Sequence, residues 1–290
     1  MIIHRDVVYA EYENYDPHLT SMDIYKPAEL ASPAPDKPLL PVIIYIHGGA
    51  LKIGDKRGVH HKPAFFTQQN YIFISINYRL SPGQPSAPVR HPMHIQDTAA
   101  AIAHIYSMIR QHHGNPDRLF IVGHSAGAYL AALIATNPSY LAEHDLPLDI
   151  LKGVIPIDTA KYDLLPIRRF ALLVPDKSWL VQALGQDLLT WQDASPAFHI
   201  NKQTESNPIP PFLLLYCNSR RDASRAATNF AKRLNKYNHF ATAVGYDDKT
   251  HLTINRQLGL PHDPPTETIM QFLNERISQL DQDELDHSAE

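Results

Sequence analysis

The sequence contains little cysteine, and it has no long hydrophobic run. Its one cysteine, Cys217, cannot form a disulfide within the chain and ends an apolar segment, which is typical of a buried structural thiol. The apolar runs are far shorter than the ~20 residues that a membrane-spanning helix needs. The N-terminus has no charged segment followed by an apolar one, so we expect no signal peptide and a cytoplasmic location.

Basic runs are absent as well. The chain has 26 Lys and Arg against 30 Asp and Glu, which gives a net charge of −4 and a pI of about 6.5. A weakly acidic chain without a basic stripe is not suited to bind nucleic acid. We therefore expect a small-molecule partner and neither nucleic acid nor membrane, while a homodimer stays open.

The 17 histidines form no metal-binding pattern. His60-His61 and His112-His113 are adjacent pairs, and His91 and His94 are three residues apart. None of these has the spacing of H-E-x-x-H or of a Cys/His zinc cluster. We therefore expect polar surface histidines, no metal and no cofactor.

Strand-like and helix-like segments alternate along the 290 residues, of which 44% are hydrophobic. This alternation predicts a mostly parallel sheet flanked by helices. We expect strands at 7–12 and 21–25 (an antiparallel pair), 42–46, 71–77, 119–124, 152–157, 212–217 and 241–246, and helices at 63–69, 94–112, 224–237 and 265–280. Residues 1–280 are expected to form one domain, followed by an acidic, disordered tail at 281–290.

The most informative stretch is Gly123-His124-Ser125-Ala126-Gly127, which matches G-x-S-x-G. It follows the apolar run 119–122 and precedes the helix-forming run 128–135, so it has the strand–turn–helix context that a serine nucleophile requires. Glycine two residues before and two residues after the serine avoids collisions on a sharp, strained turn. The pattern predicts that Ser125 is a nucleophile.

A second motif, His47-Gly48-Gly49-Ala50-Leu51, follows the apolar run 42–46. Glycines at 48 and 49 let the backbone approach a substrate closely and direct N–H groups at a developing oxyanion. The amide of Ala126 would supply a further donor. Four of the 12 glycines lie in these two motifs, so the pair predicts acyl transfer.

These motifs, together with Ile76-Asn77-Tyr78-Arg79-Leu80 and Tyr162-Asp163-Leu164, resemble those of α/β-hydrolases of the carboxylesterase branch. That branch includes hormone-sensitive-lipase-like enzymes, bacterial feruloyl and acetyl-xylan esterase-like enzymes, and kynurenine formamidases. The similarity extends over roughly residues 20–275. It implies an α/β-hydrolase fold with a mostly parallel eight-stranded sheet and a small cap after the sixth strand, at about 158–207.

Two residues depart from the family pattern. Ala50 stands where a third glycine is usual, and Leu51 stands where tryptophan often follows, which speaks against a formamidase. We expect Ala50 and Leu51 to narrow the mouth of the site, and His124, beside the serine, to contact substrate as well. The apolar residues of the cap segment would cover the acyl pocket, or alternatively would pack on the sheet.

A serine nucleophile needs a general base and a carboxylate that orients this base. In this fold the acid and then the histidine follow the serine, on loops at the carboxyl ends of strands. Asp222 follows the strand 212–217, and His251 follows the strand 241–246. These positions predict the triad Ser125, Asp222 and His251.

Other candidates have weaker positions. Asp247 and Asp248 share the loop of the histidine, His239 precedes the last strand, and His262 lies in a proline-flanked loop. A further pair fits the family pattern: Arg79 ends a strand and Asp97 begins a helix, so we expect a buried structural ion pair.

The sequence thus predicts a serine hydrolase that cleaves carboxylic esters of short to medium acyl chains or of aryl acids, through an acyl-enzyme. Two alternatives stay open: an amidase of the arylformamidase type, and a catalytically inactive binding protein with a hydrolase fold.

Overall fold

The chain folds around one eight-stranded sheet in a computed structural model that describes all residues except 31–36, 85, 174–177, 202–207 and 289–290. The sheet strands are β1 (Ile2–Val8), β2 (Ser21–Lys26), β3 (Leu40–Ile46), β4 (Ile72–Ile76), β7 (Gly114–His124), β8 (Leu151–Ile157), β9 (Phe212–Cys217) and β10 (Ala241–Tyr246). A short hairpin of β5 (Gly83–Gln84) and β6 (Ala87–Pro88) lies apart from it.

The strand order is β1-β2-β4-β3-β7-β8-β9-β10. β2 is antiparallel to both β1 and β4, whereas β4, β3, β7, β8, β9 and β10 run parallel. The carboxyl ends of these six strands therefore lie at one edge, where open α/β sheets place their sites. The predicted α/β-hydrolase architecture is confirmed.

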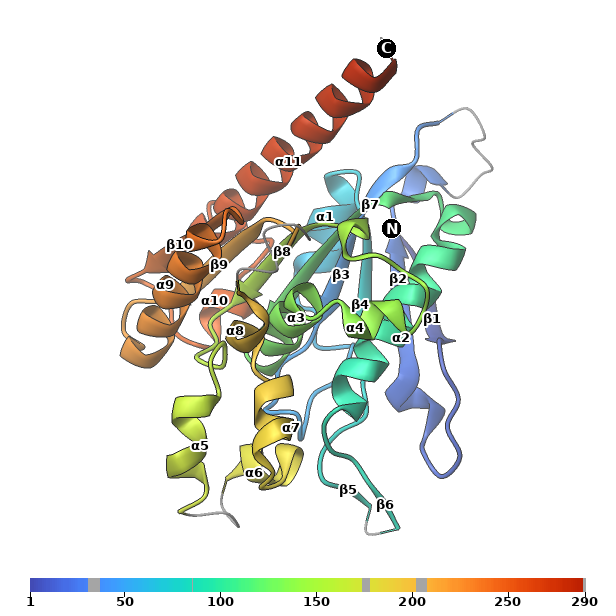
Figure 1. Cartoon of the computed structure of the whole chain (residues 1–290). Helices are drawn as coiled ribbons and strands as arrows, with labels where there is room; N and C mark the ends of the chain where they lie inside the picture. The colour runs from blue at the N-terminus through green and yellow to red at the C-terminus, as the bar shows by residue number, and fades with distance from the viewer. Residues whose placement is uncertain (31–36, 85, 174–177, 202–207, 289–290) are drawn as a thin grey trace.

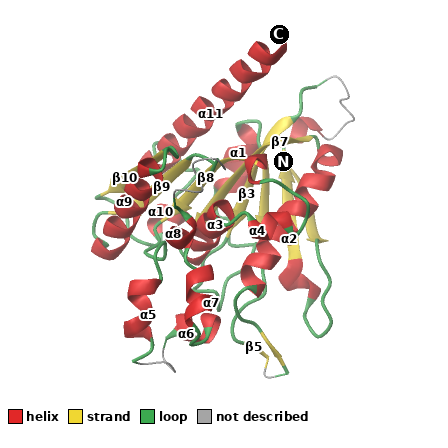
Figure 2. Cartoon of the chain, in the orientation of Figure 1, coloured by secondary structure: helices red, strands yellow, loops and turns green. Residues whose placement is uncertain are grey.

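Helices cover both faces of the sheet (Figure 2). They are α1 (Lys62–Gln68), α2 (Met93–Met108), α3 (Ala126–Thr136), α4 (Ser139–Ala142), α5 (Leu165–Ala171), α6 (Trp179–Leu184), α7 (Leu188–Asp193), α8 (Pro196–His199), α9 (Arg221–Lys236), α10 (Thr253–Arg256) and α11 (Pro264–Ser288). Short 3-10 turns lie at Pro17–Thr20, Ala28–Leu30, Ile109–His112 and Leu148–Ile150. No helix of the described residues is long and apolar enough to cross a bilayer.

Alternation along the central strands builds two separate cores, because successive side chains of a strand point to opposite faces. Ile44 and Ile46 of β3 belong to the core beneath α2, α3 and α9. Ile43 and Tyr45 belong to the core beneath α1, α10 and α11. All four side chains are fully buried, which accounts for the continuous apolar run read in the sequence.

Several predicted boundaries are wrong, including those of the first strand and of the C-terminal tail. The first strand is Ile2–Val8 rather than 7–12, and its register with β2 shifts between His4 and Val7. The predicted disordered tail continues α11 up to Ser288. Arg118 explains part of this order, because it pairs with Asp281 at 2.6 Å and with Glu284 at 3.1 Å. Residues 289–290 lie outside the described part.

The segment predicted as a cap starts where β8 ends, after the sixth strand of the sheet, and carries α5 to α8 (Figure 1). Residues 174–177 and 202–207 of this segment lie outside the described residues. Trp191 is fully buried and its indole N–H donates to the carbonyl of Gly185 at 3.0 Å. Leu188 and Leu189 are instead 47% and 71% exposed, so part of the segment packs on the core and part faces solvent.

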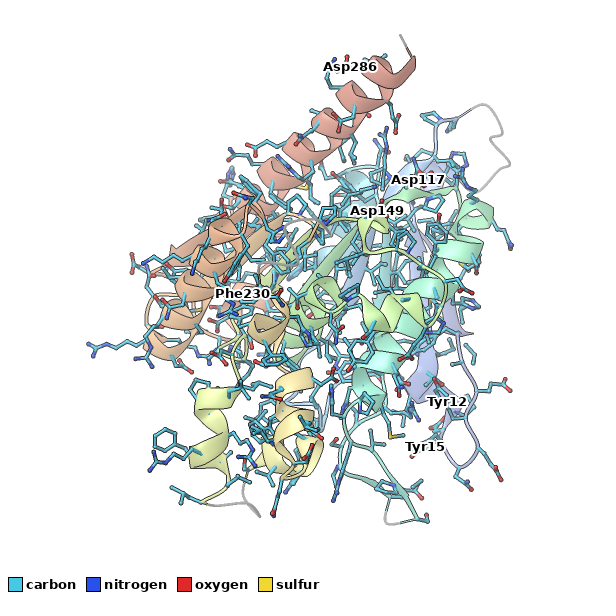
Figure 3. The ribbon with its side chains drawn as sticks, viewed as in Figure 1. Tyr12, Tyr15, Asp117, Asp149, Phe230 and Asp286 are labelled. Atoms are coloured by element: carbon cyan, nitrogen blue, oxygen red, sulfur yellow. The ribbon has the colours of Figure 1, made fainter. Side chains whose placement is uncertain are left out.

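The expected Arg79–Asp97 ion pair is confirmed. Both side chains are buried, and the guanidinium donates to the carboxylate at 2.6 and 2.8 Å. The rings of Tyr12 and Tyr15, from the β1–β2 connection, lie over the same guanidinium at 3.9 and 4.9 Å. Both tyrosines are labelled in Figure 3. The pair therefore ties β4, α2 and the N-terminal connection together.

Candidate active site

The turn between β7 and α3 holds Ser125 in a backbone conformation with φ 54° and ψ −111°. A non-glycine residue at such a φ is strained, and the surroundings fix it here, because the Ser125 amide donates to the carbonyl of Ile157 on β8 at 2.9 Å. A Cβ at Gly127 would lie 2.1 Å from the carbonyl oxygen of Ile46. Only glycine therefore lets α3 approach β3 this closely, in agreement with the sequence-based steric argument.

The second motif forms a tight turn beside this serine. Gly49 has φ 123°, and a Cβ there would lie 1.9 Å from the carbonyl oxygen of Ile53. The His47 ring stacks on Tyr78 with centroids 4.5 Å apart, and the Tyr78 hydroxyl donates to the His47 carbonyl at 3.0 Å. Burial lowers the pKa of His47 to about 4, so this side chain is neutral and anchors the turn.

The predicted oxyanion-hole residues lie around the serine. A Cβ at Gly48 would lie 3.0 Å from the Ser125 Cβ, which places this backbone against the nucleophile, and Gly49 follows it in the turn. Ala126 is the first residue of α3, so its N–H has no acceptor within the helix. The role of these three amides in catalysis stays a prediction.

His251 lies between the serine and a buried carboxylate. Its Nε2 is 3.1 Å from Ser125 Oγ, and its Nδ1 donates to Oδ2 of Asp158 at 2.6 Å. The Asp158 side chain is 0% exposed, whereas that of His251 is 36% exposed. This is the arrangement in which a carboxylate orients an imidazole that can accept the proton of a serine hydroxyl.

Several donors keep Asp158 ionised. Its Oδ1 accepts the amide of Cys217 at 3.1 Å, and its Oδ2 accepts Nη1 of Arg220 at 2.7 Å. Burial by itself raises the pKa of Asp158, but the hydrogen bonds from His251, Arg220 and Cys217 outweigh it and lower this pKa to about 2. The thiol of Cys217 is buried, and burial together with the Asp158 charge raises its pKa to about 12, as a structural thiol requires.

The structure corrects the predicted acid. Asp222 lies in the first turn of α9 with its side chain 58% exposed, and its ion-pair partner is Nη2 of Arg220 at 3.4 Å. His251 takes its carboxylate from Asp158 instead. The physical reason is that Asp158 extends over the end of β9: its amide donates to Leu215, and its carboxylate binds the Cys217 amide.

A signal for Asp158 was present in the sequence. It is the first residue after the strand that follows the nucleophile strand, and β7 and β8 are neighbours in the sheet. An acidic residue directly at the carboxyl end of a strand beside the nucleophile is a candidate by the same rule that selected Asp222. The cap predicted from the sequence begins at Asp158, so the prediction assigns this residue to the cap and not to the end of β8.

The three predicted substrate-binding residues have different positions in the structure. Leu51 is 1% exposed and packs into the core, so the expectation that its side chain narrows the mouth is wrong. Ala50 is half-buried with φ 55° and stays a candidate. Nε2 of His124 donates to the backbone carbonyl of His251 at 2.8 Å, and the two rings lie 4.7 Å apart. This contact makes His124 a support for the histidine's loop.

The expectation of surface histidines is wrong for several positions. His47, His94, His124 and His239 are buried. His94 Nε2, for example, lies 2.7 Å from the hydroxyl of Ser81, and burial lowers the pKa of His94 to about 3. Within the described residues, no three His, Cys, Asp or Glu side chains gather as metal ligands.

A cavity of about 620 Å³ lies between residues 160–167 and α9. Its floor includes the stacked rings of Tyr162 and Phe230, with centroids 4.5 Å apart (Phe230 is labelled in Figure 3). The described residues of its lining include Asp222 but neither Ser125 nor His251, so this cavity does not contain the proposed reactive groups.

Residues 22–222 match the model of the BD-FAE family. The chain belongs to the BD-FAE family. This match contains the serine turn, the HGG turn and Asp158, and it ends before His251. Family membership therefore agrees with the resemblance inferred from the motifs.

Relatives of this BD-FAE member are hydrolases by name. A probable carboxylic ester hydrolase, LipM, from Mycobacterium tuberculosis is 29% identical over 73% of this chain and 46% of its own length. A kynurenine formamidase-like hydrolase from Fusarium equiseti is 30% identical over 64% of this chain and 67% of its own length. The chain thus spans only about half the length of LipM.

Solved structures share the fold. An inhibited esterase B from Lactobacillus rhamnosis superposes with a TM-score of 0.76 at 18% identity, covering 98% of this chain and 89% of that one. Butyrate-bound esterase 2 from Thermogutta terrifontis superposes with a TM-score of 0.71 at 19% identity, covering 92% of each chain.

Proposed function

We propose that this protein is a serine hydrolase that cleaves carboxylic esters through an acyl-enzyme, with Ser125, His251 and Asp158 as its triad. The observation that carries the proposal is the continuous contact from Asp158 Oδ2 through the His251 ring to Ser125 Oγ, at 2.6 and 3.1 Å. The names of the relatives in this family support ester hydrolysis as the reaction.

The first half of the reaction forms the acyl-enzyme. Ser125 Oγ attacks the carbonyl carbon of the ester while Nε2 of His251 takes the hydroxyl proton. Asp158 holds the Nδ1–H tautomer and balances the charge of the imidazolium. The amides of Gly48, Gly49 and Ala126 stabilise the oxyanion, and His251 then gives its proton to the departing alcohol.

The second half releases the acid. A water molecule gives a proton to His251 Nε2 and attacks the acyl carbon, and the returned proton frees Ser125. Every proton in this cycle moves through Nε2 of one histidine. The cycle uses side chains and backbone amides of this chain alone.

For the substrate we propose esters of short to medium acyl chains, roughly C2 to C8, or of aryl acids. Propionate- and butyrate-bound structures of the Thermogutta terrifontis esterase support a short acyl group for that enzyme. An amide substrate of the formamidase type is the second candidate, because a relative carries the name of a kynurenine formamidase-like hydrolase.

The test combines labelling with turnover. Wild-type protein is treated with a fluorophosphonate probe and assayed on p-nitrophenyl esters from C2 to C16 and on an aryl formamide. We expect stoichiometric labelling at Ser125 and the highest kcat/KM at or below C8. Ser125→Ala should abolish labelling and lower turnover by roughly 10³-fold or more with the fold intact.

The outcomes separate the candidates. Faster hydrolysis of the formamide than of every ester would establish the amidase alternative. Absence of both labelling and turnover in the folded wild type would favour an inactive binding protein. Highest activity on C16 esters would contradict the proposed chain length.

A further inference from the structure

A fourth side chain touches the reactive groups. Nη1 of Arg220 lies 2.7 Å from Asp158 Oδ2, 3.0 Å from the Asp158 backbone carbonyl and 2.7 Å from Nδ1 of His251. The Arg220 side chain is 30% exposed. One guanidinium nitrogen therefore contacts both the carboxylate and the imidazole of the proposed triad.

The effect of this contact depends on whether Nδ1 of His251 carries a proton. Arg220 Nη1 can only donate. When Nδ1 of His251 carries a proton, this proton and the guanidinium both point at Asp158 Oδ2. When Nδ1 is bare, Arg220 can donate to it, but the imidazole proton then sits on Nε2 and faces Ser125, where it blocks proton transfer. An ionised Asp158 favours the productive arrangement, because a carboxylate is a stronger acceptor than a neutral imidazole.

The positive charge of Arg220 also affects the charge states of its two neighbours. A cation 2.7 Å from Oδ2 stabilises the ionised carboxylate of Asp158. It also opposes a positive charge on the neighbouring imidazole, so the His251 ring faces an ion pair rather than an isolated anion. Arg220 thereby places a fixed positive charge beside the imidazole nitrogen that faces the carboxylate.

The surroundings hold Arg220 in place from two sides. Its amide donates to the Cys217 carbonyl at 3.0 Å, and its carbonyl accepts from Ser224 at 2.9 Å in the first turn of α9. Nη2 lies 3.4 Å from Asp222, which gives the rejected acid a role as an outer anchor of the guanidinium.

Other titratable groups also face this cluster. The ring of His124 packs against His251, and its own pKa is lowered to about 3, mainly by burial, so it is neutral. Further charged or ionisable neighbours interact electrostatically with these side chains: Tyr162 with Asp158, Lys62 with His124, Lys161 with Asp222 and Arg220, and Asp248 with Cys217. Among the residues that the structure describes, Arg220 alone places a charge in direct contact with both Asp158 and His251.

We propose that Arg220 is a positioning residue of this centre, which holds Asp158 ionised and aligned toward His251 and so extends the activity of the enzyme to lower pH. The proposal rests on the proposed ester hydrolysis. It assigns no group transfer to the arginine, because Arg220 acts through Asp158 and His251.

The test is the pH profile of kcat/KM for p-nitrophenyl acetate, measured for the wild type, Arg220→Met and Arg220→Lys. Arg221→Met is the matched control, because Arg221 is the exposed neighbour on the same turn. For Arg220→Met we expect kcat to fall about 10- to 100-fold, the loss expected for a hydrogen bond to a charged group, with little change in KM. We expect the acidic limb to move up by roughly one pH unit, because the pKa of Asp158 rises once the guanidinium that lowers it is removed.

The conservative variant separates positioning from folding. Arg220→Lys keeps the charge but not the planar fork, so its kcat and acidic limb should lie between those of the wild type and Arg220→Met. Arg221→Met should match the wild type. Melting curves identify any variant that does not fold, and if Arg220→Met is one, Arg220→Lys decides alone.

An acidic limb and a kcat equal to wild type in a folded Arg220→Met would overturn the proposal. So would a wild-type profile in Arg220→Lys when Arg220→Met does not fold. Failure of the proposed function looks different, because then the wild type itself neither hydrolyses the ester nor reacts with the fluorophosphonate.

Discussion

The carboxyl ends of β8 and β9 are neighbours in the sheet, and they bring opposite charges to the same imidazole nitrogen. Asp158, directly after β8, reaches Nδ1 of His251 at 2.6 Å, and Arg220, shortly after β9, reaches it at 2.7 Å. The acid is 0% exposed and the arginine 30% exposed. Side chains from the ends of two adjacent strands thus both contribute to orienting His251.

This difference shows that a position at the carboxyl end of a strand brings a side chain near the site but does not decide its function there. The backbone at Asp158 turns with φ 53° and is held over β9 by its hydrogen bond to Leu215. The carboxylate therefore occupies the space that an acid from the β9 loop would need. The guanidinium of Arg220, from the loop after β9, lies in the remaining space, and Asp222 lies at the surface of α9.

The largest expected effect comes from removing the carboxylate of Asp158, and removal of the Asp222 carboxylate is its control. Asp158→Asn should lower kcat by about 10³-fold or more, because an amide favours the wrong imidazole tautomer. Asp222→Asn should stay within about three-fold of the wild type, since an exposed ion pair contributes little. Steady-state kinetics on p-nitrophenyl acetate decides between them, and the reverse ranking would restore Asp222 as the acid.

A smaller effect is expected at the support of the histidine's loop. His124→Phe keeps a ring but removes the hydrogen bond to the His251 carbonyl, so kcat should fall about ten-fold, in line with the loss of one buried hydrogen bond. Fluorophosphonate labelling should slow by the same factor. Unchanged labelling would mean that packing alone holds the loop.

The ionisation of Asp158 should also affect the free energy of unfolding. The pKa of Asp158 in the fold, about 2, lies below its ordinary 3.8. The ionised carboxylate therefore stabilises the protein above about pH 4, and this contribution is lost as the pH falls toward 2. Between pH 6 and pH 3 the wild type should lose about 1 kcal/mol more unfolding free energy than Asp158→Asn. Urea titrations at both pH values measure this, and equal losses would contradict it.

The smallest effect is expected far from both strand ends. Truncation after Leu280 removes the partners of Arg118, Asp281 and Glu284, which are exposed. Because surface ion pairs contribute little, the unfolding free energy should fall by less than about 1 kcal/mol, with kcat/KM unchanged. A marked loss of activity would show that α11 influences the site.

Local motifs were predictable because their constraints are local. The serine turn needs glycine at 123 and 127 within five residues, and the HGG turn needs a positive φ at Gly49. The strands at 212–217 and 241–246 coincide with β9 and β10, since apolar runs bounded by polar residues carry a local signal. The burial of His94 and His124 was not predictable, because it depends on acceptors elsewhere in the fold.

The sequence by itself determined the architecture and the sharp turn that carries Ser125, the proposed nucleophile, because short-range sterics and hydrophobic patterning decide these features. Only the tertiary structure decided which carboxylate faces His251. Asp158 and His251 are 93 residues apart in the chain, and their contact depends on the turn at the end of β8 and the hydrogen bonds that hold it over β9. Arg220 became part of the site for the same reason, since no local pattern shows that a side chain from the next strand end will reach the same nitrogen.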